Sequence, residues 1–316
     1  TLSDPKTIAG LEQLQALYAD ASLAPVTEAD STPRVNINNN AATGAPEELA
    51  DQIRATAVTV VVFAGARVEP TDGSLNEAVE FARANGPFDV IIAVGGGSSI
   101  DTAKAVNLLV TNDGELMDYV NAPVGRAKAP TRPLLPLIAV PTTTGTGSES
   151  TTICVLDVVA QNVKTGISHA ALRPTYAVVD PQLTYTQPAA VTAASGLDVL
   201  CHALESYTAR PYQSYEAKQA SERVPYCGSN PISDLWSERA MSLMSTAFVA
   251  AVRNGKDEAA REQMALAATF AGLGFGNAGV HIPHANAYPI AGQVGDFQPA
   301  GYPDPDGTID HGLVPP

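Results

Sequence analysis

Asp198 and His202 have the residue types and the spacing of a metal site. If residues 193–207 form a helix, side chains four positions apart lie on the same face, one above the other. A carboxylate and an imidazole in that arrangement can hold one divalent cation without distorting the backbone. The stretch also allows two other interpretations. Ser195 and Asp198 have the spacing of a helix capping box, and His202 sits among apolar residues, like a core histidine.

Two imidazoles near the end of the chain could complete such a site, since a metal needs three or four ligands from separate segments. His281 and His284 are three residues apart. Pro283 lies between them and argues against one continuous helix through both, so we expect at most one of them in the site. His311 lies further on in Asp310-His-Gly, and His169 is expected at the surface.

Two loops rich in small residues have the composition of nucleotide-binding loops. Gly95-Gly96-Gly97 stands between an apolar run and a predicted helix, where the backbone can approach phosphate oxygens and the helix N-terminus offers free N–H groups. This loop matches neither the Rossmann fingerprint nor a Walker loop, and alone it can be a tight turn. Residues 141–149, Pro-Thr-Thr-Thr-Gly-Thr-Gly-Ser-Glu, follow another apolar run. Two such loops at the same ends of parallel strands would face one crevice, which favours a nucleotide.

The elements that would position these residues change in kind along the chain. Strands are predicted from the apolar runs 58–63, 88–94, 135–140 and 176–179, with helical patterns between them. This alternation predicts a parallel α/β sheet, whereas only helical patterns follow Pro188, including 231–253 and 256–272. We therefore predict an α/β nucleotide-binding domain over residues 1–180 and an all-α metal-binding domain over residues 181–316. The Asp198 helix would lie just past the boundary, where a cleft between the domains is expected.

Residues 11–57 carry the weakest pattern. Residues 35–46 are predicted to be a polar loop, followed by a helix that includes residues 47–53. The next helix is predicted to open at Ser74, which has a capping-box spacing with Glu77. Its apolar side consists of Leu75, Ala78, Val79 and Ala82.

Composition excludes several classes of protein. A chain of 316 residues that is 45% hydrophobic can fill two cores. The net charge of −15 argues against binding to nucleic acid, and no run of 18 apolar residues suggests a membrane span. The start of the chain does not resemble a signal peptide. Three widely spaced cysteines suit reduced thiols in the cytoplasm, or in the mitochondrial matrix of a eukaryote.

Five segments occur in the same order as in the iron-containing alcohol dehydrogenases, a family that the chain therefore resembles. They are GGGSSIDTAKA, PTTTGTGSES, LRPTYAVVDP, ASGLDVLCHALESYTARP and GNAGVHIPHANAYPIAG. The resemblance covers residues 58–316 and a short piece around Asp4. Within the family the sequence is most similar to the hydroxyacid–oxoacid transhydrogenase branch. That similarity rests on YVNAPVGRAKAP, on ESYTARPY with GSNPISDLW after it, and on Tyr288, where many alcohol-active relatives carry His.

The resemblance implies a fold and a set of site residues. The fold is that of dehydroquinate synthase and its relatives, an α/β NAD-binding domain followed by a helical domain, with the active site between them. The catalytic metal-ligand positions of the family fall on Asp198, His202 and His284. A fourth ligand would be a His directly after Pro316, outside the chain, or else His311. The implied NAD-binding residues are Gly96, Gly97, Ser98 and Asp101 at the pyrophosphate, Thr142, Thr143 and Thr146 on the nicotinamide side, Lys164 at the nicotinamide ribose, and Asp4 at the adenosine ribose.

The implied function is that of a metal- and NAD-dependent oxidoreductase acting on a small molecule. The metal, Fe²⁺ or Zn²⁺, would act as a Lewis acid on the substrate oxygen while hydride passes between substrate and nicotinamide. The branch implies a hydroxy acid and an oxo acid of the 4-hydroxybutyrate and 2-oxoglutarate type. Three alternatives stay open: a plain NAD-dependent alcohol dehydrogenase, a metal-dependent lyase of the dehydroquinate synthase type, and an inactive protein that keeps NAD without the fourth ligand. The sequence leaves a homo-oligomer open as well.

Overall fold

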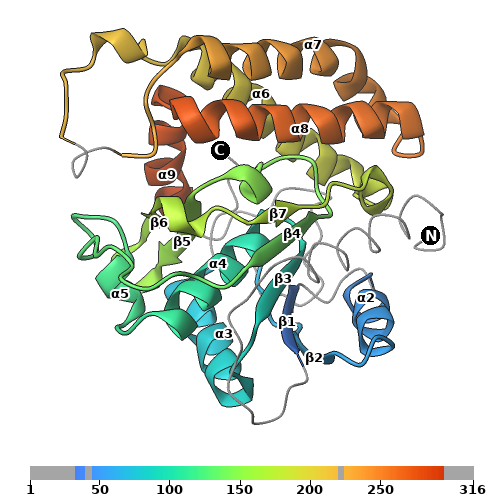
Figure 1. The fold of residues 1–316 in the computed structure, drawn as a ribbon. Helices are drawn as coiled ribbons and strands as arrows, with labels where there is room; N and C mark the ends of the chain where they lie inside the picture. Colours follow the sequence, from blue (N-terminus) through green and yellow to red (C-terminus); the bar gives the residue numbers. More distant parts are fainter. Residues whose placement is uncertain (1–32, 40–44, 220–223, 295–316) are drawn as a thin grey trace. The chain divides into compact units, whose positions relative to one another are not determined.

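A computed structural model describes residues 33–39, 45–219 and 224–294 (Figure 1). Asp4 and His311 lie outside the described residues, as does the stretch 40–44 of the predicted polar loop. The roles given to these residues therefore stay predictions.

A parallel sheet forms the core of the first half of the described chain. Its strand order is β2-β1-β3-β4-β7, and all neighbouring strands run parallel. Every residue of β3 is buried, which is why this strand is a continuous apolar run in the sequence. The strands are β1 (Arg34–Asn39), β2 (Thr59–Phe63), β3 (Val90–Gly95), β4 (Leu137–Pro141) and β7 (Tyr176–Ala177).

Helices cover both faces of this sheet. On one face, α2 (Ala45–Arg54) packs with the apolar residues of β1 and β2. On the other face, α3 (Asp72–Asn85) and α4 (Gly97–Thr111) pack with Ile91 and Ala93 of β3. Successive side chains of a strand point to opposite faces, so β3 contributes to both cores. The predicted α/β architecture is confirmed. A short helix, α5 (Leu116–Tyr119), follows α4.

Residues 34–39 form β1, an interior strand of the sheet, so the prediction of a polar loop there was wrong. β1 lies between β2 and β3. Val35 and Ile37 enter one apolar core, while Asn36 and Asn38 are buried at the alternate positions. The Asn38 amide donates a hydrogen bond to Asn36 Oδ1 at 2.5 Å. These asparagines concealed the strand, because a buried parallel strand is usually recognised by an uninterrupted apolar run.

α3 begins two residues before the predicted start. Its N-cap is Thr71, whose side chain accepts from Ser74 N, and the Ser74 hydroxyl accepts from Thr71 N in return. Ser74 is thus the far partner of a capping box and not its start, and Glu77 has no part in it. The predicted apolar side of the helix, from Leu75 to Ala82, is buried as expected.

An antiparallel hairpin outside the main sheet had not been predicted. Its strands are β5 (Ile153–Val158) and β6 (Val163–Ser168), and Asp157 pairs with Lys164 across it. Cys154, Leu156 and Ile167 join the core that contains α3 and α4. The hairpin therefore holds Lys164 on an element anchored to the α/β half.

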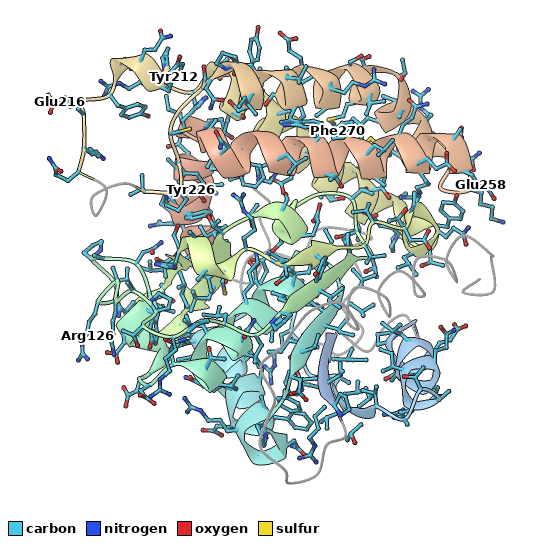
Figure 2. The ribbon with its side chains drawn as sticks, viewed as in Figure 1. Arg126, Tyr212, Glu216, Tyr226, Glu258 and Phe270 are labelled. Carbon is cyan, nitrogen blue, oxygen red and sulfur yellow. The ribbon has the colours of Figure 1, made fainter. Side chains whose placement is uncertain are left out.

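From Ala189 onward the described chain is helical, as predicted. The helices are α6 (Ala189–Thr208), α7 (Pro231–Arg253), α8 (Glu258–Ala278) and α9 (Ile282–Val294). α6, α7 and α8 pack together through small residues such as Ala203, Ala247 and Ala268. Trp236 of α7 and Phe270 of α8 pack with ring centroids 5.2 Å apart, and Figure 2 places Phe270 on α8. The exact division at residue 180 stays a prediction.

No single described helix is long and apolar enough to cross a membrane. α8 and the first ten residues of α9 meet the length and composition criteria only as a pair bent by 99°.

Candidate active site

Asp198 and His202 lie on consecutive turns of α6 and face each other. Asp198 Oδ1 is 3.4 Å from His202 Nε2, and both side chains are buried. Because α6 begins at Ala189, Ser195 lies inside the helix and cannot be its N-cap. The capping-box interpretation of Ser195 and Asp198 is therefore wrong.

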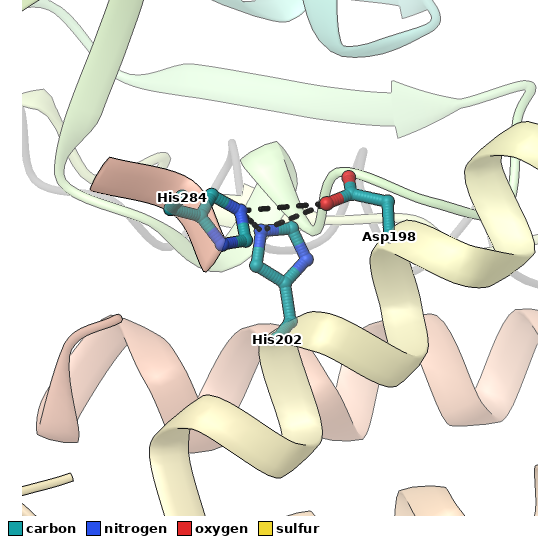
Figure 3. A group of neighbouring side chains, drawn as sticks. All are labelled: Asp198, His202 and His284. Atoms are coloured by element: carbon teal, nitrogen blue, oxygen red, sulfur yellow. Dashed lines mark hydrogen bonds and ion pairs between the residues drawn. The ribbon is translucent and has the colours of Figure 1, made fainter. Parts of the chain in front are cut away.

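α9 brings a third donor atom to the same point. His284 Nε2 lies 3.5 Å from Asp198 Oδ1 and 3.0 Å from His202 Nε2 (Figure 3). One donor atom from each of these three buried residues lies within 4.8 Å of the other two. His281 precedes α9, and its ring nitrogen Nε2 contacts Thr208 Oγ1 instead. Only one of the two neighbouring histidines enters the cluster, which is what Pro283 led us to expect.

The donor set of this cluster fits a divalent cation. Asp198 Oδ1 is buried and accepts no hydrogen bond from any described residue. A carboxylate oxygen in that state is costly unless a cation compensates it. Two imidazole nitrogens, which are metal ligands through their lone pairs, face the same oxygen. Asp198, His202 and His284 together therefore offer a metal one anionic and two neutral ligands.

The two histidines differ in their electrostatic surroundings. Burial lowers the pKa of His202 to about 4, against the opposing charge of Asp198. This ring is therefore neutral near pH 7, which is the form that binds a metal. Burial also lowers the pKa of His284, but the charges of Asp198 and Glu205 and the hydrogen bond to Glu205 outweigh it, so that the pKa of His284 is raised. Phe275 of α8 stacks on the His202 ring with centroids 3.9 Å apart and holds it in place.

The two predicted nucleotide loops lie side by side at the carboxyl ends of β3 and β4. Thr142 N donates to Gly95 O at 3.0 Å, and Gly95 pairs with Pro141. A β-carbon on Gly97 would lie 2.6 Å from side-chain atoms of Thr146, so the loops meet where only glycine fits. α4 starts at this point with Gly96 as its N-cap and no side-chain cap. Its first N–H groups therefore point to where an anion would bind.

The second loop also touches the helix that carries the metal ligands. A β-carbon on Gly145 would lie 2.6 Å from the β-carbon of Ser195, one turn before Asp198 on α6. Gln187 Nε2 donates to Ser195 Oγ at 2.9 Å, and Gln187 Oε1 accepts from Thr144 N at 3.3 Å. The same loop thus contacts the glycine loop on one side and α6 on the other.

A pocket of about 650 Å³ lies between the β5–β6 hairpin and α9, and Lys164 and Tyr288 line it. Lys164 forms ion pairs with Glu69 and with Asp157, the latter at 2.9 Å. Burial lowers the pKa of Lys164, but these two carboxylates outweigh it and leave that pKa raised, so the amine stays cationic. Burial raises the pKa of Tyr288 to about 12. Tyr288 follows His284 by one turn of α9, although none of the three cluster residues lines the pocket itself.

With this geometry established, comparison with known proteins places the chain in a family. Residues 24–181 match the model of the iron-containing alcohol dehydrogenases, and residues 192–295 match the model of the C-terminal part of the Fe-containing alcohol dehydrogenase family. The chain belongs to the iron-containing alcohol dehydrogenase family.

Individual relatives agree with this assignment. The chain is 49% identical over 268 residues to a mouse protein named hydroxyacid-oxoacid transhydrogenase, mitochondrial. That match covers 84% of this chain but 56% of the mouse protein, so the chain spans about half the length of this relative. Among solved structures, 1,3-propanediol oxidoreductase superposes with a TM-score of 0.74 at 29% identity, covering 92% of this chain and 68% of that one. Sulfoacetaldehyde reductase from Bifidobacterium kashiwanohense, solved with NAD⁺, gives 0.70 at 30% identity and covers 82% and 63%.

Within this member of the iron-containing alcohol dehydrogenases, Asp101 contacts protein groups on both carboxylate oxygens. Oδ1 accepts from Ser148 Oγ at 2.5 Å and from Lys104 Nζ at 3.1 Å, and Oδ2 accepts from Val155 N at 2.8 Å. Lys104 is fully buried and also donates to Thr151 Oγ1 at 3.1 Å. Asp101 and Lys104 thus link α4 to Ser148 at the end of the second loop, and the role of Asp101 at the pyrophosphate stays a prediction.

The other predicted residues lie as follows. Ser98 Oγ accepts a hydrogen bond at 3.2 Å from the backbone N–H of Glu69, the residue that also forms an ion pair with Lys164. A β-carbon on Gly96 would lie 3.2 Å from Thr143 Oγ1, so Thr143 borders the glycine loop. His169 caps a short 3-10 helix by accepting a hydrogen bond from Ala171 N, and it is not part of the metal-ligand cluster.

Sequence reasoning missed three residues that the structure places around the site, which are Lys104, Glu205 and Phe275. Glu205 could have been found, since it follows Asp198 by seven residues and His202 by three and so shares their helix face. Phe275 carried no such signal, because its contact with His202 depends on how α8 packs against α6.

Proposed function

We propose that this chain carries the nucleotide- and metal-binding parts of a metal- and NAD-dependent oxidoreductase that interconverts hydroxy acids and oxo acids. The observation that supports it most is the buried cluster of Asp198, His202 and His284. The similarity to mitochondrial hydroxyacid-oxoacid transhydrogenases supports the substrate class and suggests a mitochondrial location.

Asp198, His202 and His284 would hold a divalent metal, with Fe²⁺ favoured by the family and Zn²⁺ compatible with the same ligands. When bound, such a metal supplies Lewis acidity toward the oxygen of the substrate. The residues themselves keep the site dry and fixed. Phe275 holds the His202 ring, and the burial of all three donors excludes water from the metal-facing side.

The paired loops would hold NAD, which supplies the acceptor for hydride. Gly96, Gly97 and Ser98 lie at the N-terminus of α4, which has no side-chain cap. Pyrophosphate oxygens can accept hydrogen bonds from the backbone N–H groups there. Thr142, Thr143 and Thr146 lie opposite them. We assign these contacts to residues 1–180 and the metal to residues 181–316, so that hydride would cross between the two parts.

Lys164 and Tyr288 would border the reacting groups. Lys164 remains charged in its pair of carboxylates and can donate to a ribose hydroxyl or another ligand oxygen. Tyr288 stays neutral near pH 7 because its pKa is about 12. It therefore presents a hydroxyl to the pocket and no second titrating base beside the metal ligands.

The family assignment favours an oxidoreductase over a lyase of the dehydroquinate synthase type. A plain NAD-dependent alcohol dehydrogenase would share every metal-ligand and loop residue named above. The difference between the two lies in whether NADH leaves the protein after each turnover, as in the plain dehydrogenase, or stays bound until the second acid has been reduced.

The test uses the purified protein loaded with metal and stripped of loosely held nucleotide. It receives 4-hydroxybutyrate and 2-oxoglutarate without added NAD, and 2-hydroxyglutarate is measured. Product in many-fold excess over protein supports the transhydrogenase. Turnover that requires added NAD and leaves NADH in solution identifies a plain dehydrogenase, and no turnover in either case rejects the proposed function.

A further inference from the structure

Glu205 is a buried carboxylate one turn beyond His202 on α6. It is 1% exposed and ranks among the largest side chains buried in the described chain. A carboxylate so far from water must be compensated by hydrogen bonds or by charge. The hydrogen-bond partners of Glu205 therefore indicate its role.

Both oxygens of Glu205 are directed at the start of α9. Oε1 lies 2.6 Å from Nδ1 of His284. Oε2 accepts from the backbone N–H of His281 at 2.6 Å and, at 3.5 Å, from that of His284. The carboxylate thus fixes the backbone at the first turn of α9 and, at the same time, the ring that this turn carries. A negative charge is also favourable at a helix N-terminus.

This contact decides which nitrogen of His284 faces the metal cluster. With Nδ1 donating its proton to Glu205, the lone pair of the neutral ring is on Nε2. Nε2 is the atom that lies 3.5 Å from Asp198 Oδ1 and 3.0 Å from His202 Nε2. A carboxylate that holds the far nitrogen of a ligating histidine is a recurrent device for orienting metal ligands.

We propose that Glu205 is a positioning residue that sets the tautomer and the direction of His284, so that α6 supplies two metal ligands and aligns the third. The inference rests on the proposed metal site. Glu205 does not act as a fourth ligand, because its oxygens are engaged by α9 and it lies outside the group of converging donor atoms.

Glu205→Gln is the informative variant, because it keeps the shape of the side chain and leaves one acceptor oxygen. That oxygen cannot serve both the His284 ring and the His281 N–H, and the new NH₂ group opposes one of these two donors. A role limited to packing would tolerate this change. The positioning role predicts a loss of metal affinity of about 10- to 100-fold.

Affinity is measured for Zn²⁺ by competition with a chromophoric chelator on metal-free protein. The matched control is Glu149→Gln, which replaces another buried carboxylate. The side chain of Glu149 accepts a hydrogen bond from Thr269, and none of its hydrogen bonds is to one of the three metal ligands. Glu149→Gln is expected to bind Zn²⁺ as the unmodified protein does. Equal affinity of Glu205→Gln and the unmodified protein, with a lower melting temperature for the variant, would show a structural role only and overturn the proposal.

Two further measurements keep the outcomes distinct. The ¹⁵N shifts of His284 in the unmodified, Zn²⁺-loaded protein are expected to show a protonated Nδ1, and a protonated Nε2 would reject the proposal even if the variant fails to fold. His202→Ala reports on the metal site itself. If that variant keeps tight Zn²⁺, the proposed site fails, whereas loss in His202→Ala without loss in Glu205→Gln removes only the role of Glu205.

Discussion

The Nε2 atoms of His202 and His284 lie 3.0 Å apart, although the two residues are separated by 82 positions in the chain. Two neutral imidazole nitrogens at that distance repel each other unless a proton or a cation lies between them. Asp198 Oδ1, buried and without a hydrogen-bond donor among the described residues, faces the same point. The packing of α9 against α6 therefore concentrates lone pairs in one place, which is costly in folding and useful in binding a metal.

His202→Ala tests this cluster. We expect the variant to lose tight divalent metal and nearly all turnover, because one of three converging ligands is gone. NAD binding should survive, since the nucleotide loops follow β3 and β4. Metal content by elemental analysis and NAD affinity by fluorescence titration measure the two effects separately. His169→Ala serves as the control, because His169 caps a short 3-10 helix and takes no part in the cluster. Metal retained in His202→Ala would refute the assignment.

Gly97→Ala tests whether the two loops must touch. The added β-carbon would lie 2.6 Å from the side chain of Thr146, so the loops have to move apart. We expect NAD affinity to fall by about tenfold or more, which corresponds to roughly 1.4 kcal/mol. Gly73→Ala on α3 is the matched control, because its β-carbon would meet nothing closer than 3.7 Å. Isothermal titration of NAD into both variants gives the comparison. Equal affinities would show that the close contact between Gly97 and Thr146 is not needed for NAD binding.

Much of this site could be predicted from the sequence where ligands are close together along one element. Asp198 and His202 are four residues apart on one helix, and the glycine loop follows an apolar strand directly. His284 could be assigned only through the family resemblance, because nothing in local spacing shows that α9 packs against α6. β1 was missed for a related reason. Asn36 and Asn38 bond to each other inside the fold, and that pairing depends on the finished strand.

Lys104→Met tests the contribution of the buried ion pair between Lys104 and Asp101. Lys104 is fully buried and pairs with Asp101, so its removal leaves a buried carboxylate without its cation. We expect a loss of about 3–5 kcal/mol in the free energy of unfolding. Arg132→Met is the control, because Arg132 pairs with Asp113 at the surface and is expected to contribute less than about 1 kcal/mol. Urea denaturation of the two variants measures both values. Similar small losses would mean that Asp101 does not depend on Lys104.

Tyr288→Phe tests the environment of the pocket through the dependence of stability on pH. Burial raises the pKa of Tyr288 from an ordinary value near 10 to about 12 in the folded protein. The unfolded chain therefore loses this proton first, as pH rises past about 10, while the folded protein keeps it. The contribution of the neutral hydroxyl is fully present below pH 10 and is lost progressively between pH 10 and 12.

We therefore expect the unmodified protein to lose more stability than Tyr288→Phe when urea denaturation is repeated at pH 8.5 and at pH 11. Other tyrosines and Lys164 titrate in the same range, but they are present in both proteins, so the difference between the two curves isolates Tyr288. Parallel curves would mean that Tyr288 is as accessible to water in the folded protein as in the unfolded one. An exposed hydroxyl of Tyr288 would ionise in alkaline solution and would then be a second titrating group near His284. The presence of tyrosine in place of histidine at this position would then have to be explained by the size of the side chain.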